Sequence, residues 1–206
     1  MAMLLGCVAA VVLGFVYSYV VNWIPFIYLN FIATVAFGAG LGFAVGWGAK
    51  IGKIRNDWVA GAVGAICGLV GLYVAWAVDP LARFGEDGPG LAFDPELLSE
   101  YMKIFYAAGC WGIGQEGDAV SGVFLAILWL IEAAVIVGGS ALVAAMFLSG
   151  QPFCEECNQW TTTEQDVQRL SLQGQDQDTL ERLLTGDVMA LTELYRAEPD
   201  ETDHFR

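Results

Sequence analysis

Four long apolar runs dominate the first 150 residues and constrain the fold more than any other feature of the chain. They cover residues 4–21, 27–47, 58–78 and 122–148. Each run has about 18 residues or more with almost no charge, and a helix rising ~1.5 Å per residue would cross a hydrocarbon core about 30 Å thick. The sequence therefore predicts an all-α protein with a four-helix transmembrane bundle over residues 1–150.

Charge separates the bundle from the rest of the chain. The composition is 56% hydrophobic and 16% charged, too apolar for an ordinary soluble domain. Of the net charge of −14, residues 1–150 carry −5 and residues 151–206 carry −9. This acidic balance argues against nucleic acid and anionic lipid headgroups as partners. We expect the lipid bilayer as the main partner and an acidic tail over 151–206.

The positions of the basic residues predict the orientation. Lys50, Lys53 and Arg55 lie between the second and third runs, whereas residues 22–25 contain no base. Short basic loops stay in the cytoplasm, so the N- and C-termini are expected there and the connection 79–121 outside. The first run has no basic n-region or cleavage site and reads as a retained span. A compact four-span plan favours a bacterial inner membrane.

Glycines recur at helical spacing in the second and third runs. The members of these two faces are Gly38, Gly42 and Gly46, then Gly61, Gly64, Gly68 and Gly71. Small faces let helices approach closely in a bilayer, where lipid tails are as apolar as leucine. The simplest interpretation is packing of the second span on the third. A homo-oligomer or a pore lined by small residues is the sharper alternative.

Glu132 is the ionisable residue nearest the middle of a span. A carboxylate at that depth costs several kcal/mol unless it is protonated, paired or wet. One interpretation is a protonated, hydrogen-bonded group that holds the bundle together, with no intramembrane Lys, Arg or His to pair with it. The other is a transporter or channel site that uses Glu132 and the glycine faces.

The connection 79–121 is too long for a plain turn. Asp79-Pro80 is expected to end the third span, and residues 95–107 have the apolar spacing of an interfacial helix. Its expected apolar face consists of Leu97, Leu98, Tyr101, Ile104 and Phe105. The acids of this connection are expected to lie in a solvated loop.

The tail begins with a Cys-x-x-Cys motif at Cys154 and Cys157. This spacing lets both sulfurs bind one tetrahedral ion, and Asn158 can adopt the left-handed conformation that closes such a knuckle. The stretch resembles the first knuckle of a zinc ribbon, which implies zinc as a cofactor. Because no second Cys-x-x-Cys follows, His204 is a candidate third ligand, and a second chain could complete the site. A truncated chain or a degenerate ribbon is expected.

Two other interpretations of the motif remain open. The first is disulfide exchange, making the protein a membrane thiol oxidoreductase, although Glu155 and Glu156 are expected to disfavour the thiolate that this chemistry needs. The second is a pair of free cytosolic thiols without a special role. Beyond the motif, residues 179–184 and 188–195 predict a small helical hairpin. Its leucine face is expected either to pack against the knuckle or to bind a cytoplasmic protein partner.

The chain as a whole resembles uncharacterised bacterial four-span integral membrane proteins with a zinc-ribbon-like C-terminal tail. The likeness lies in the Gly/Trp segment before the fourth span, in Trp129 and Glu132, and in the Cys-x-x-Cys tail, and it extends over residues 108–160. It implies an architecture rather than a reaction. The sequence predicts a non-enzymatic assembly or adaptor component, since one histidine leaves little material for acid–base catalysis.

Overall fold

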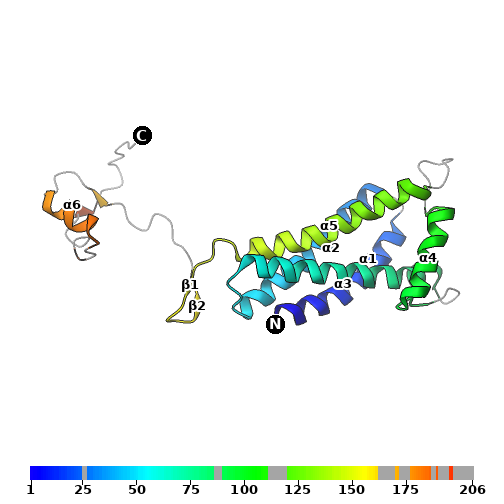
Figure 1. Ribbon diagram of the computed structural model, residues 1–206, viewed down its shortest axis with the longest axis horizontal. Coiled ribbons are helices and arrows are strands. Elements are labelled where there is room, and N and C mark those ends of the chain that lie inside the picture. The colour runs from blue at the N-terminus through cyan, green and yellow to red at the C-terminus, as the bar shows by residue number, and fades with distance from the viewer. Residues whose placement is uncertain are drawn as a thin grey trace. The chain divides into compact units, whose positions relative to one another are not determined.

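The computed structural model describes residues 1–24, 27–85, 90–110, 120–161, 170–171, 177–186, 189 and 195–196. The chain divides into two compact units, Met1–Gly150 and Gln151–Arg206. The first unit contains four long helices: α1 (Ala2–Trp23), α2 (Ile27–Ile51), α3 (Asp57–Phe84) and α5 (Gly122–Leu148) (Figure 1). All four are long and apolar enough to cross a membrane. The predicted four-helix membrane bundle is therefore confirmed, and the protein is an integral membrane protein.

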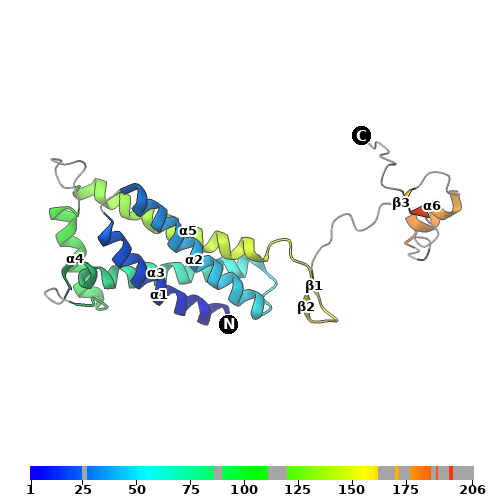
Figure 2. The same cartoon turned by 180° about the vertical axis from the view of Figure 1, so that it is seen from behind.

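The four helices form a bundle in which α1 and α5 occupy opposite corners. Helix α1 packs along α2 and α3, and α5 packs along the same two helices, while α2 and α3 touch each other less. Figures 1 and 2 show the bundle from opposite sides. Helices that follow one another in the chain are therefore not always the closest neighbours.

Helix α3 extends beyond the apolar run at both ends. Its N-terminus is capped by Asn56, whose side chain accepts from the backbone N–H groups of Trp58 and Val59. Contrary to the sequence prediction, α3 does not end at Asp79-Pro80 but contains Pro80 and ends at Phe84, with Gly85 at φ 61° as the C-cap. Hydropathy thus located the span, whereas local capping sets the ends of the helix.

The sequence predicts that the glycine faces of α2 and α3 pack on each other. In the structure, most of these glycines instead face α5. A Cβ at Gly42 and one at Gly64 would each lie 2.6 Å from the backbone oxygen of Ser140 on α5. Ser140 is fully buried, and its hydroxyl donates to the Gly64 carbonyl at 2.8 Å. Gly71 instead faces the Phe37 and Leu41 side chains. Both faces are filled within one chain, mostly by α5.

Helix α4 (Pro95–Ala108) lies across one end of the bundle (Figure 1). Asp94 caps it by accepting from the backbone N–H of Glu96 at 2.9 Å. Leu98 and Tyr101 are buried, whereas Ile104 of the expected apolar face is 63% exposed. The Ala92 N–H donates to the Ala77 carbonyl at 2.8 Å, which fastens the segment before α4 to α3 near Pro80.

The second unit contains short elements. Strand β1 (Phe153–Cys154) pairs antiparallel with β2 (Gln159–Trp160), and β3 (Leu170–Ser171) pairs antiparallel with β4 (Tyr195–Arg196). Helix α6 (Gln177–Leu184) covers the first of the two expected tail helices. The second was expected over 188–195, but Tyr195 belongs to a strand, and most of that segment lies outside the described residues.

Candidate functional site

Glu132 lies in a hydrogen-bonded chain that joins three helices of the bundle. The Tyr17 hydroxyl of α1 forms a hydrogen bond with Glu132 Oε1 of α5, with the two oxygens 2.5 Å apart. The same hydroxyl lies 2.9 Å from Thr34 Oγ1 of α2. Thr34 Oγ1 in turn lies 2.9 Å from the Asn30 carbonyl oxygen, to which it donates. The Tyr17 side chain thus connects α1 with α5, the two helices at opposite corners of the bundle.

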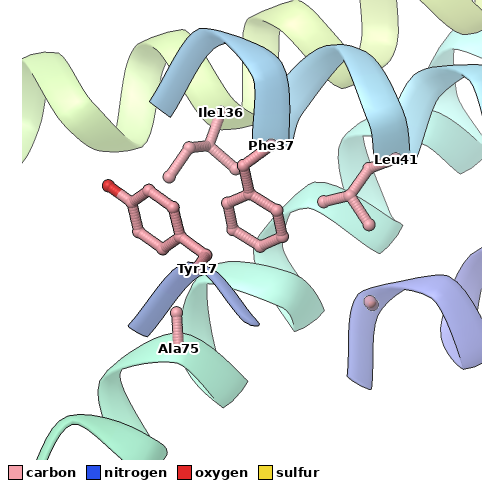
Figure 3. Close-up of a cluster of buried hydrophobic side chains, with 6 residues drawn as sticks. Tyr17, Phe37, Leu41, Ala75 and Ile136 are labelled. Atoms are coloured by element: carbon pink, nitrogen blue, oxygen red, sulfur yellow. The ribbon is translucent and has the colours of Figure 1, made fainter. Parts of the chain in front are cut away.

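An apolar cluster closes the bundle on one side of this chain. It consists of Ala10, Tyr17, Phe37, Leu41, Ala75 and Ile136. The Tyr17 and Phe37 rings stack with centroids 4.7 Å apart. Figure 3 shows the Tyr17 ring against Phe37, with its hydroxyl pointing away from Leu41. Beyond this cluster follow the close contacts of Ser140 with the α2 and α3 glycines.

A second polar cluster lies on the other side, at the α4 end, around Asp79. Its carboxylate accepts from Asn22 Nδ2 at 2.7 Å and from the Tyr101 hydroxyl at 2.5 Å. Arg83 completes the cluster, with Nε 3.3 Å from Asp79 Oδ2 and the guanidinium 4.9 Å from the Phe105 ring centre. Asn22 also lines a surface pocket of about 400 Å³ between the ends of α1 and α3.

Tyr101 and Cys110 lie outside the spans, and the charges of this cluster affect the pKa of each. Burial, followed by the hydrogen bond to Asp79, raises the pKa of Tyr101. Burial also raises the pKa of Cys110 to about 11, a shift that Arg83 opposes and that Asp79 reinforces. Cys110 is therefore a protonated, weakly nucleophilic thiol at neutral pH.

The Cys-x-x-Cys motif forms a tight hairpin between β1 and β2. The backbone N–H of Cys157 donates to Cys154 Sγ at 3.3 Å. Asn158 has φ 52°, the left-handed conformation that the sequence predicts. The hairpin is clamped by the Phe153 and Trp160 rings, 5.1 Å apart and edge-to-face, and by a bond from the Thr161 N–H to the Pro152 carbonyl at 2.9 Å.

The hairpin makes its two thiols unequal. The hydrogen bond from the Cys157 backbone lowers the pKa of Cys154, and the side-chain hydrogen bond to Cys154 raises the pKa of Cys157. Glu155 raises the pKa of Cys154, as the sequence predicts for a neighbouring carboxylate, but the hydrogen bond from the Cys157 amide outweighs it. One thiol is predisposed to be a metal ligand or nucleophile.

The predicted site residues fall into two separate units. Glu132 and the seven glycines belong to the bundle, and Cys154 and Cys157 belong to the tail. His204, the candidate third ligand, lies outside the described residues. Among the described residues, no group of three or more His, Cys, Asp or Glu side chains could hold a metal ion.

Sequence reasoning missed Tyr17, Thr34 and Asp79 as partners in polar clusters. Tyr17 lies 115 residues from Glu132 in the chain, and a hydroxyl within an apolar run gives no signal of its partner. Asp79 was read as the end of a helix. Its place next to a proline in an otherwise apolar run was the one available sign.

Comparison with known proteins adds no relative. No family model, curated protein or solved structure matches the chain. The resemblance to bacterial four-span proteins with a zinc-ribbon-like tail therefore stays a prediction.

Proposed function

We propose that the protein is a non-enzymatic assembly or adaptor component of a membrane, with a tail that binds Zn²⁺ through Cys154 and Cys157. The observation that carries this proposal is the hairpin geometry. An amide N–H directed at Cys154 Sγ stabilises the thiolate, which is the form that binds metal. Left-handed Asn158 then directs the chain after Cys157 into β2.

Two thiolates are half of a tetrahedral zinc site. The other two ligands would come from His204 with another group, from a second copy of the chain, or from a cytoplasmic protein partner. A site that is completed by another chain would make metal binding and assembly one event. Fixing the tail to four membrane helices would hold that event at the bilayer.

Metal content of the purified full-length protein tests this function. We expect about one zinc per chain if His204 helps complete the site, and about half if two chains share one ion. The Cys154→Ser/Cys157→Ser variant should lose the zinc, whereas Cys110→Ser, which removes a half-buried thiol outside the hairpin, should keep it. Zinc no higher in the wild type than in the double variant would overturn the metal role.

Partner binding is tested on the same preparations. We expect a soluble protein to co-purify with wild-type protein through residues 151–206 and to be lost from the double cysteine variant. A partner retained by the double variant would separate the adaptor role from the metal. A readily oxidised Cys154/Cys157 pair with no zinc would instead support the thiol oxidoreductase alternative.

A second candidate function is a small transporter or channel subunit that uses Glu132. The observation in its favour is the series of polar groups from the Asp79 cluster at the α4 end to the Tyr17–Glu132 bond. On the other side of this bond the described side chains form an apolar cluster, so the polar groups extend toward the α4 end. Cation or proton flux into proteoliposomes that is lost in Glu132→Gln, but kept in the exposed control Glu96→Gln, would support it.

A further inference from the structure

We propose that Glu132, Tyr17 and Thr34 form a proton-binding site in which Glu132 is protonated at neutral pH. The ligand is a proton, held on the Glu132 carboxyl group and exchanged through the polar groups at the α4 end. The inference does not depend on the knuckle in the tail, and it holds whether or not the protein transports anything.

The proposal follows from the number of hydrogens that three oxygen–oxygen contacts require. Three oxygen–oxygen contacts of hydrogen-bond length run in series: Glu132 to Tyr17 at 2.5 Å, Tyr17 to Thr34 at 2.9 Å, and Thr34 to the Asn30 carbonyl at 2.9 Å. Each contact needs one hydrogen. The Tyr17 and Thr34 hydroxyls supply two, and a carbonyl supplies none. With all three hydrogen bonds made, the third hydrogen comes from the Glu132 carboxyl group.

When Glu132 is protonated, all the hydrogen bonds in this series point the same way. Glu132 donates to the Tyr17 oxygen, Tyr17 donates to Thr34, and Thr34 donates to the Asn30 carbonyl. When Glu132 is ionised, Tyr17 turns its hydrogen toward the carboxylate, and one of the other two contacts loses its hydrogen. Proton release therefore reverses the Tyr17 hydroxyl and leaves a buried polar contact unmade, which favours the protonated form.

Among the described residues, the polar groups around this proton lie toward the α4 end. On one side the Phe37, Leu41 and Ile136 side chains close the bundle. On the other side, Asn30 lies one turn before Thr34, and its side-chain oxygen is buried with no partner among the described residues. Such an acceptor is where a water molecule binds. The Asp79 cluster follows, and its Asn22 lines a surface pocket.

Titratable groups around Glu132 come from several elements. They are Tyr17 of α1, Asp79 and Arg83 of α3, Tyr101 of α4 acting through Asp79, and Cys110 after α4. Among these described groups Arg83 is the one cation, and it is paired with Asp79. Among the described groups around Glu132, no positive charge is therefore left over to hold this carboxyl group ionised.

Infrared spectroscopy of the full-length protein in lipid nanodiscs tests the proposal. At neutral pH we expect the C=O band of a protonated carboxylic acid, which shifts in D₂O and disappears in Glu132→Gln. The control Glu96→Gln, on the exposed side of α4, should keep it. The same band intensity in wild type and Glu132→Gln, or a band that appears in wild type only on acidification, would overturn the proposal.

A second variant keeps the test decisive if Glu132→Gln fails to fold. Tyr17→Phe removes the phenol that accepts the Glu132 hydrogen, so the C=O band should move to higher frequency as the carboxyl loses its partner. An unmoved band would show that the proton lies elsewhere. A retained band without any ion flux would leave the proton site intact and remove only the transporter function.

Discussion

The polar site in the bundle and the cysteine hairpin of the tail reach a defined geometry by opposite routes. In the bundle, Tyr17 and Glu132 are 115 residues apart and meet because four helices are packed closely. In the hairpin, all the contacts fall between Pro152 and Thr161, within one short turn that includes left-handed Asn158. The first site should fail when helix packing fails, and the second should fail only when its own residues change.

The largest expected effect is the loss of bundle packing on replacing Gly42. Gly42→Leu would place a Cβ 2.6 Å from the Ser140 backbone oxygen and 2.7 Å from Val143 Cβ. Overpacking of this kind costs about 3 kcal/mol, so the thermal midpoint in detergent should fall sharply. The matched control is Gly138→Leu on α5, where a Cβ meets nothing within 4 Å.

The same variants sharpen the comparison between the two sites. Gly42→Leu should also weaken or abolish the infrared band assigned to Glu132, while zinc bound per chain stays at the wild-type level. Loss of both signals together would mean that the hairpin depends on the bundle.

The next effect concerns thiol reactivity. Alkylation proceeds through the thiolate, so Cys110, with its pKa raised to about 11, should react roughly a hundredfold more slowly than Cys154 at about pH 7.5. Its rate should keep rising with pH up to about 11, whereas the rate at Cys154 should level off below the ordinary thiol pKa of ~8.5. Site-resolved mass spectrometry after removal of metal measures both rates. Equal rates with one shared midpoint would contradict the assigned environments.

A smaller effect is expected at Asn158. Its φ of 52° costs a β-branched residue ~1–2 kcal/mol, so Asn158→Val should weaken zinc binding by about tenfold. Asn158→Gly should bind as well as wild type, since glycine adopts this conformation without strain. Competition with a chromophoric chelator gives both affinities. Equal affinities for the Val and Gly variants would show that the turn does not set the site.

The smallest effect is expected at Ser140. Ser140→Ala removes the hydrogen bond to the Gly64 carbonyl but leaves the close helix contact. Hydrogen bonds between membrane helices average about 0.6 kcal/mol and reach about 1.7, so the thermal midpoint should fall slightly. A loss as large as that of Gly42→Leu would mean that hydrogen bonding, rather than close contact, holds α5 in place.

The sequence predicted the class of fold because hydropathy alone is enough for four apolar spans. It misjudged the end of α3, since a membrane helix can contain a proline when neighbouring groups satisfy the freed backbone. Three residues before Pro80, the Ala77 carbonyl accepts from the Ala92 N–H, a tertiary contact that no hydropathy profile shows.

Helix partners were harder to predict than helices. A glycine face shows that some helix comes close, but not which one, and both faces turned out to receive Ser140 of α5. Glu132 was recognised because a carboxylate is rare within a span, whereas its partner Tyr17 resembles any aromatic residue in an apolar run. The turn at Asn158 was predictable because its contacts are local.

The most direct test of the central claim is X-ray absorption at the zinc edge of the full-length protein. If the hairpin binds zinc, the spectrum will show two sulfur ligands at about 2.3 Å, or four if two chains share one ion, with any remainder nitrogen or oxygen. A zinc coordination shell of nitrogen and oxygen alone would contradict the account, because the ion would then be bound without Cys154 and Cys157.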